Sequence, residues 1–293
     1  KSFSASALSM YLDCRLRFYF RYVAELKEKE EVVSEIDPMT FGTLLHSAIE
    51  LLYAIGEGKS HRDIDSHTID RLKDQVPAAV DRAIRIFYKK EEGEEFELSG
   101  QLLIAREVFI KYVKEILTYD QKNGPFRVIG LEKKYLAGIP VETVQGRVEV
   151  SLQGVIDRMD IKDGAVRLLD YKTGKDNKKV SSIASLFNRD DDNRNKAAMQ
   201  TLLYAYFYQH YHADNQLPIK PGIFNIKEIY DSKFNPFLVM NKEEIRDYRD
   251  FAREFEQGLS ELLAEIFNPE VPFDQTEDEK KCTYCAYKEI CGR

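Results

Sequence analysis

The sequence predicts an α/β protein in which helical regions enclose a run of β-strands. Four consecutive segments between residues 126 and 171 are rich in the β-branched and aromatic residues that favour strands. Before and after them, apolar residues recur at the spacing of amphipathic helices. Asp163-Gly164, between the last two strand segments, is a strong hairpin signal because glycine accepts the positive φ of such turns. We therefore expect a sheet with helices packed around it.

The composition is that of a globular protein with a sizeable core. Of the 293 residues, 43% are hydrophobic and 32% are charged, and we expect a single domain over residues 1–293. No apolar run is long enough to cross a bilayer and no charged-then-apolar leader is present, so we expect no membrane partner. Because the chain opens on Lys1 rather than methionine, we expect it to be part of a larger parent protein.

Charge and cysteine content exclude two broad classes. The net charge of −7 argues against a protein held to nucleic acid by bulk charge, so any such contact must come from a local basic patch. Four cysteines are too few for a disulfide scaffold. A cytoplasmic location is the simplest expectation.

Residues 1–125 are expected to be mainly helical. The aromatic-rich segment 2–22 predicts a largely buried helix, and the charged segment 24–38 predicts a loop or an exposed arm. Further helices are expected at 41–53, 69–90 and 101–123, with a solvated acidic connection at 91–97.

Residues 126–240 are expected to form the sheet core, and residues 241–293 a final helix and a cysteine-containing tail. The expected strands are 126–136, 141–152, 154–161, 165–171, 221–229 and one around 237–240. Helices are expected at 197–211, within the core, and at 242–267, before the tail.

The predicted hairpin carries the first group of residues suited to chemistry. Asp157 lies on its first strand and Asp170 on its second, and Lys172 shares a face with Asp170 because strands have a period of two. Carboxylate oxygens are the ligands that Mg²⁺ prefers, and such ions bridge protein to phosphate. A nearby lysine can hold a water nucleophile. For an isolated Asp-x-Lys, ordinary surface charge is the simpler interpretation.

Two helices and one strand offer further candidates. His46 and Glu50 lie at i and i+4 on one helix face, where a histidine–glutamate pair at the core edge is the simpler interpretation. Gln200 and Tyr204 have the same spacing on the helix 197–211. Glu132, on the first strand, fits a rim charge and a role near the site equally well.

The cysteines form the second distinctive pattern. Cys282, Cys285 and Cys291 lie within ten residues, and the fourth, Cys14, lies near the start of the chain. Four thiolates suit a [4Fe–4S] cluster or a structural Zn²⁺, and the spacing alone does not separate them. Two disulfides or free buried thiols are the remaining alternatives.

These motifs together resemble a known family. His46 in Gly-Thr-Leu-Leu-His, Asp157 in Gly-Val-Ile-Asp-Arg, Asp170-Tyr-Lys-Thr-Gly and Gln200-Thr-Leu-Leu-Tyr occur in the order found in RecB-type nucleases of the PD-(D/E)xK superfamily. The cysteine pattern resembles its iron–sulfur branch, which includes AddB-type helicase–nuclease subunits and CRISPR-associated adaptation nucleases. The resemblance covers residues 14–291. Ile156 stands where the superfamily usually has proline, which removes no ligand.

The resemblance implies a fold and a set of roles. The fold would be a restriction-endonuclease-like core, a mixed sheet flanked by helices. Asp157, Asp170, His46 and the Tyr171 carbonyl would bind Mg²⁺ or Mn²⁺, and Lys172 would orient or deprotonate the attacking water. Gln200 and Tyr204 would position the lysine or the DNA. Cys14, Cys282, Cys285 and Cys291 would hold a structural [4Fe–4S] cluster that joins the two ends of the chain.

The function implied is metal-dependent DNA cleavage by the nuclease domain of a helicase–nuclease in double-strand break repair, with helicase domains in the parent chain or a partner subunit. The alternatives are a stand-alone iron–sulfur exonuclease of the CRISPR-adaptation type, a DNA-binding module that has lost cleavage, and a zinc-stapled interaction domain. Retention of both acidic residues and the lysine weighs against lost cleavage. The residues expected to contact DNA are Arg158, Lys175, Lys178, Lys179, Arg189, Arg194 and Lys196.

Overall fold

The computed structural model describes residues 2–27, 37–90, 94, 100–144 and 146–293. Most of the predicted arm at 24–38 and of the acidic connection at 91–97 lies outside these residues. None of the helices in the described segments combines the length and the apolar character needed to cross a lipid bilayer.

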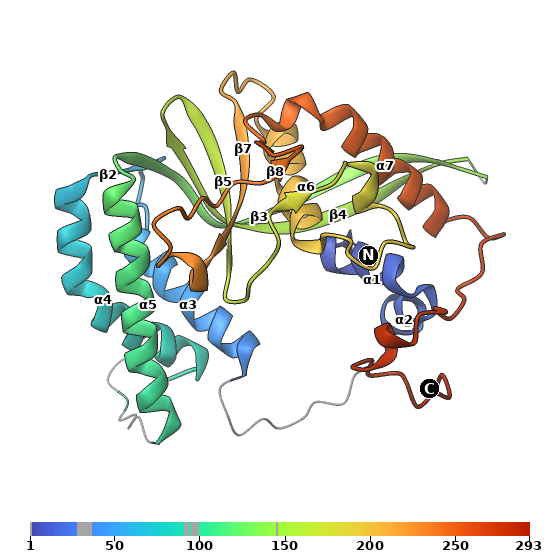
Figure 1. Ribbon diagram of the computed structural model, residues 1–293, viewed down its shortest axis with the longest axis horizontal. Helices are drawn as coiled ribbons and strands as arrows, with labels where there is room; N and C mark the ends of the chain where they lie inside the picture. Colours follow the sequence, from blue (N-terminus) through green and yellow to red (C-terminus); the bar gives the residue numbers. More distant parts are fainter. Residues whose placement is uncertain (1, 28–36, 91–93, 95–99, 145) are drawn as a thin grey trace.

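A mixed sheet forms the centre of the molecule and confirms the predicted fold class (Figure 1). Within the described ranges it has six strands, and only β1–β4 and β5–β7 pair in parallel. The order across the sheet is β2 (Arg62–Ile64), β3 (Phe126–Thr143), β4 (Gly146–Lys162), β5 (Ala165–Lys172) and β7 (Ile219–Asn225), with β1 (Ser2–Phe3) beside β4.

The strands β3 and β4 form one long hairpin, so the predicted division into strands at 126–136, 141–152 and 154–161 is wrong. Pro140 does not end β3 because β2 pairs only with residues 126–128, and the N–H side at Pro140 needs no strand partner. Gly154 does not end β4 either. A Cβ atom there would lie 2.8 Å from Phe207 and 3.1 Å from Tyr204, so the glycine lets helix α6 approach the sheet.

Helices cover both faces of the sheet (Figure 1). The helices α3 (Pro38–Tyr53), α4 (Ser66–Phe87) and α5 (Gln101–Lys122) pack on one face, and α1 (Ala5–Asp13), α6 (Lys196–Tyr211) and α7 (Ala252–Ile266) on the other. The side chains of β5 alternate between these two cores, with Leu168 in one and Leu169 in the other. Asp170 and Lys172 therefore face α6, whereas Tyr171 faces α3–α5.

The predicted first helix is interrupted at Cys14. This residue is extended, with φ −162°, and its thiol accepts a hydrogen bond from the Arg17 N–H at the start of α2 (Arg15–Phe18). A π-helical turn, η1 (Tyr19–Val23), follows.

Shorter elements replace parts of two other predictions. The strand predicted to reach residue 229 ends at Asn225 and continues as the 3-10 turn η3 (Ile226–Glu228). The helix predicted from residue 242 begins only at Ala252. Before it lie a small sheet of β6 (Lys179–Val180), β8 (Val239–Met240) and β9 (Glu243–Glu244), and the turn η4 (Tyr248–Asp250). The turns η2 (Ala184–Leu186) and η5 (Glu279–Cys282) complete the elements of the described segments.

The two ends of the chain lie side by side, as the blue and red segments in Figure 1 show. The Leu16 N–H donates to the Asp274 carbonyl at 2.9 Å, and the Tyr287 hydroxyl donates to the Leu26 carbonyl at 2.8 Å. The rings of Phe18 and Phe273 stack with their centroids 6.2 Å apart. These contacts bring the segment around Cys14 against the cysteine tail.

Arg158 is the centre of a buried ion network on the α5 side of the sheet. Its side chain has no exposed surface and lies 2.7 Å from carboxylate oxygens of both Asp120 and Asp160. The Tyr53 hydroxyl donates to Asp120 at 2.6 Å, and Arg167 also contacts Asp160. The prediction that Arg158 contacts DNA is therefore wrong, because the guanidinium is enclosed and already paired.

We expect Arg158→Met to lower the free energy of unfolding by about 3–5 kcal/mol, because it leaves two buried carboxylates without their cation. Urea unfolding measures this loss. The matched control is Arg147→Met, since the Arg147 side chain is 69% exposed near the tip of the hairpin and should be replaceable without cost. Equal stability of the two variants would contradict a structural role for Arg158.

Candidate active site

The predicted hairpin does bring its charged residues together. Asp157 in β4 accepts a hydrogen bond from the Tyr171 N–H at 2.8 Å, which ties it to the neighbouring strand β5. Lys172 Nζ lies 2.8 Å from Asp170 Oδ2 and 3.0 Å from Gln200 Oε1 on α6. The Gln200 amide in turn donates to the Tyr204 hydroxyl. The two strands and α6 thus converge on Lys172.

Asp157 and Asp170 are carboxyl groups held away from water. Asp157 is 7% exposed and Asp170 1%. Burial raises the pKa of both side chains, and the charge on Asp170 raises the pKa of Asp157 further. Asp170 Oδ2 accepts no hydrogen bond within the described structure, although it lies close to Lys172. The pair is therefore short of positive charge and of donors.

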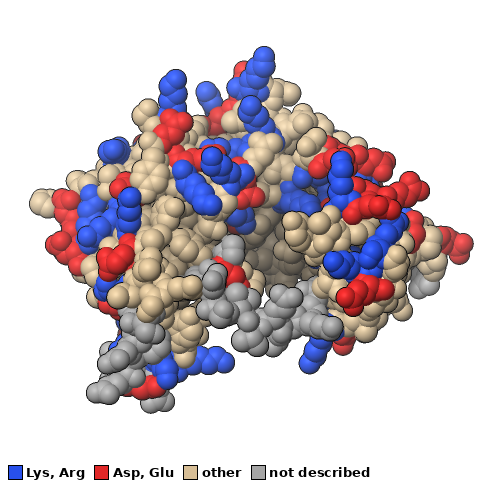
Figure 2. Space-filling model, turned by 60° about the horizontal axis from the view of Figure 1, so that its bottom comes forward, with Lys and Arg blue, Asp and Glu red and all other residues tan. Residues whose placement is uncertain are grey.

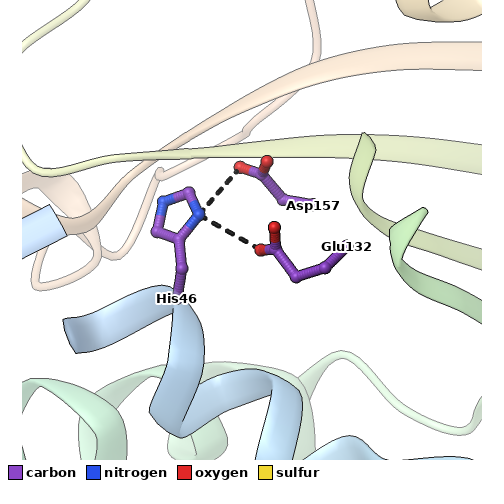
Figure 3. Close-up of side chains that lie close together, drawn as sticks. All are labelled: His46, Glu132 and Asp157. Carbon is purple, nitrogen blue, oxygen red and sulfur yellow. Dashed lines mark hydrogen bonds and ion pairs between the residues drawn. The ribbon is translucent and has the colours of Figure 1, made fainter. Parts of the chain in front are cut away.

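His46 supplies part of the missing charge from helix α3 (Figure 3). Its Nδ1 lies 3.3 Å from Glu132 Oε1 and 3.6 Å from Asp157 Oδ2, and its Nε2 faces the Tyr171 carbonyl at 3.1 Å. Burial of the ring would lower the pKa of His46, but the hydrogen bond with Glu132 and the charge on Asp157 raise it to about 9. The partner of His46 is thus Glu132 and not Glu50, which is exposed.

Glu132 is the residue that the sequence did not place with certainty. Its neighbours Leu131 and Lys133 pair with Arg158 and Ile156, so it lies across the ladder from Asp157. Like charges in that position repel each other unless a cation lies between them. Glu132 also has φ +44°, a left-handed conformation that is rare for a non-glycine residue and is concentrated at functional sites.

The donor set fits a divalent cation. One ligand atom each from His46, Glu132 and Asp157 can be chosen so that all lie within 4.8 Å of one another. The orphaned Asp170 oxygen and the Tyr171 carbonyl border the same group. Oxygen ligands with one imidazole suit Mg²⁺ or Mn²⁺.

Three of the lysines expected to contact DNA lie together beyond β5. Lys175, Lys178 and Lys179 line a cavity of about 770 Å³, together with Lys227, Lys233, Phe234 and Phe237. Lys178 pairs with Glu228 at 2.8 Å and lies 4.7 Å from the centre of the Phe234 ring. Basic side chains interleaved with aromatic rings are typical of a single-strand binding groove.

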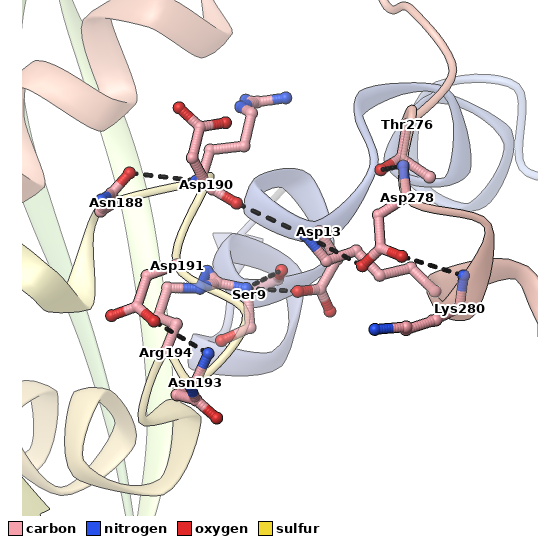
Figure 4. A network of polar contacts seen from close by, with 12 residues as sticks. Ser9, Asp13, Asn188, Asp190, Asp191, Asn193, Arg194, Thr276, Asp278 and Lys280 are labelled. Atoms are coloured by element: carbon pink, nitrogen blue, oxygen red, sulfur yellow. Dashed lines mark hydrogen bonds and ion pairs between the residues drawn. The ribbon is translucent and has the colours of Figure 1, made fainter.

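The arginines of the loop 188–194 are held by the protein itself (Figure 4). Arg194 contacts Asp13, and its side chain is only 3% exposed. Arg189 pairs with Glu265 at 3.1 Å. For Arg194 the predicted DNA contact is wrong, because the side chain is enclosed between the loop and α1. Lys196 also contacts Asp13 but is 56% exposed.

The four cysteines are free thiols. Cys14 and Cys285 are buried, and Cys282 and Cys291 are partly so. Burial raises the pKa of Cys282 and of Cys291, and the charges of the other thiols near them, Cys14 among them, raise both further. The cysteines from the two ends of the chain therefore lie within electrostatic reach of one another.

A helix-flanked mixed sheet whose adjacent central strands present Asp157 and Asp170-x-Lys172, with a helical histidine beside them, defines the class: a nuclease fold with an acidic catalytic centre. The chain belongs to the PD-(D/E)XK nuclease superfamily, whose family model matches residues 2–292.

The relatives found among characterised proteins share one name, since each is the B subunit of an ATP-dependent helicase/deoxyribonuclease. The chain is 28% identical to the protein from Carboxydothermus hydrogenoformans over 187 residues, which are 59% of this chain and 16% of that protein. It is 29% identical to the Clostridium novyi protein over 198 residues, 61% of this chain and 16% of the relative. The matched region is thus a small part of much longer proteins.

Proposed function

We propose that this chain is a metal-dependent DNA nuclease domain of a helicase–nuclease that acts in double-strand break repair, and that residues 1–293 form one such domain. The observation that carries the proposal is the convergence of Asp157, Asp170, Lys172 and His46 on one polar cleft. The name shared by the relatives favours a helicase partner over a stand-alone exonuclease.

Asp157, Asp170, His46 and the Tyr171 carbonyl would hold Mg²⁺ or Mn²⁺, and Glu132 joins them as a fifth group. A bound cation of this kind polarises a phosphate and makes its bound water more acidic. The protein contributes the fixed geometry. Asp157 is held by the Tyr171 N–H, so the ligand does not have to be ordered when substrate arrives.

Lys172 is held ready to act on phosphate. Asp170 keeps the ammonium charged, and Gln200 fixes its direction while Tyr204 fixes Gln200. Burial opposes the charge on Lys172, but Asp170 outweighs this effect and raises the pKa of Lys172. A lysine that stays charged orients the attacking water and stabilises negative charge on the phosphate, which we favour over removal of the water's proton.

We expect Lys172→Ala and Asp170→Ala each to lower the rate of cleavage by about 10²–10⁴-fold while the fold persists, because each removes a group that acts at the phosphate. The assay is degradation of end-labelled linear DNA with Mg²⁺ or Mn²⁺. Lys162→Ala is the control, since Lys162 lies at the far end of the hairpin beside Asp163. A wild-type rate in either site variant would contradict the assignment, and no cleavage by the wild-type protein would contradict the function.

Glu132→Gln should weaken Mn²⁺ binding by about 10- to 100-fold, because it removes a charge that contacts His46. Calorimetric titration of the metal measures the change without any cleavage. Glu50→Gln is the matched control: the same change on α3, one turn beyond His46, should leave the affinity at the wild-type value. Equal affinities for all three proteins would place Glu132 outside the metal site.

We also propose that Cys14, Cys282, Cys285 and Cys291 hold a [4Fe–4S] cluster that joins the ends of the chain. The mutual effects of the thiols on their pKa values and the packing of the tail on α2 support it. Bound to the four thiolates, the cluster would serve as a cross-link, which is most effective in principle when it closes a long loop.

Cys14→Ser should lose iron and visible absorbance as fully as Cys285→Ser, because a four-thiolate cluster that lacks one ligand is labile. Limited proteolysis should then cut more easily within residues 1–40 and 268–293. The measurements are iron content and digestion of anaerobically purified protein. Full iron and an unchanged digestion pattern in Cys14→Ser would exclude this residue as a ligand, and zinc in place of iron in the wild type would replace the cluster with a zinc site.

A further inference from the structure

A second cavity lies on the other side of Lys172 from the lysine-lined one. It measures about 340 Å³ and is bordered by Lys172 and Gln200 from the catalytic centre. The N-terminal helices and the start of α6 form the rest of its wall, including Ser6, Ser9, Asp13, Arg17 and Lys196. Figure 2 shows that the molecule is hollowed at the centre of one face, with lysine and arginine side chains along the rim.

Arg17 is the unusual member of this wall. Its Nε is buried and has no hydrogen-bond partner, and no carboxylate in the described parts of the chain pairs with its guanidinium. Leaving a buried charged donor unmatched costs free energy unless a ligand supplies the acceptor. Most other arginines of this protein, such as Arg15 and Arg106, contact carboxylates.

The remaining charges of the cavity also favour an anion. Asp13 is already shared between Arg194 and Lys196, so its single negative charge faces two cations. Asp176 is the other carboxylate of the wall. Ser6 and Ser9 offer hydroxyl groups. Together with Arg17, the wall presents the surplus of donors that a phosphodiester requires.

The two cavities are continuous with one track across the catalytic centre. Asp176 borders both of them, and Lys172 lies on the wall of the smaller one. A strand that is cut at Lys172 must continue on both sides of the scissile phosphate. The lysine-lined cavity can accept one side, and the cavity of Arg17 lies where the other side must pass.

The chain also holds Arg17 firmly in place. Its N–H donates to the thiol of Cys14 at 3.4 Å, and the preceding residue, Leu16, donates to the Asp274 carbonyl. The short helix α2 that carries Arg17 is therefore fixed at its start by a thiol and by the tail.

We infer that the cavity between α1, α2 and α6 binds a backbone phosphate of the DNA strand being cut, next to the scissile phosphate, with Arg17 as its main ligand and Lys196 as the second. This inference rests on the proposed nuclease function and adds the course of the strand. It makes the cysteine-anchored end of the chain a part of the substrate site.

The test is the salt dependence of binding to a fluorescent single-stranded oligothymidylate, measured by anisotropy in EDTA so that the strand stays intact. Arg17→Gln should reduce the slope of log affinity against log salt by about 0.7, the value for one phosphate contact on a single strand. Lys196→Gln should do the same, and its exposed side chain keeps the test valid if Arg17→Gln fails to fold. Arg17→Lys should retain the slope because it retains the charge.

Arg147→Gln, which removes an arginine near the hairpin tip, is the control and should bind as the wild type does. Wild-type slopes for Arg17→Gln and Lys196→Gln, in a protein that still cleaves DNA, would overturn the inference alone. Equal losses in Arg17→Lys and Arg17→Gln, with both variants folded by thermal melting, would show a structural role and overturn it too. A wild-type protein that neither binds nor cuts DNA would instead refute the proposed function.

Discussion

The arrangement of this protein depends on one electrostatic constraint: two carboxylates, Asp157 and Asp170, are buried on neighbouring strands. Burial of charge is costly unless opposite charge and donors surround it. Lys172 and His46 supply the opposite charge, and the Tyr171 N–H supplies a donor. The compensation is incomplete without a further cation, and that deficit is what makes the cleft a site rather than part of the core.

Tyr171 joins this cleft to the opposite side of the sheet. Its N–H donates to Asp157, its carbonyl faces His46, and its hydroxyl accepts from the buried guanidinium of Arg158 at 3.1 Å. The ion network of Arg158 with Asp120 and Asp160 thus supports the catalytic strand from behind. A residue that never meets substrate can therefore influence where the carboxylates point.

Local periodicity was enough to predict the central part of the site, and distant contacts were not. The period of two along β5 places Asp170 beside Lys172, and the same rule, applied to β4, turns Arg158 away from Asp157, which should have removed Arg158 from the DNA-binding set. Glu132 depends on the register of β3 against β4 and on a left-handed φ, neither of which a strand pattern contains. Arg194 depends on Asp13, 181 residues away, a pairing that only the folded chain creates.

Gly154 has a consequence for how the activity of such a domain can change over time. The absent side chain sets the distance between the sheet and α6, since Phe207 and Tyr204 occupy the space where a Cβ would lie. A methyl group there would push against Tyr204, which holds Gln200 and through it Lys172. Turnover can thus be tuned by inheritance or by design from a position that contacts neither the nucleophile nor the strand, with every catalytic side chain unchanged.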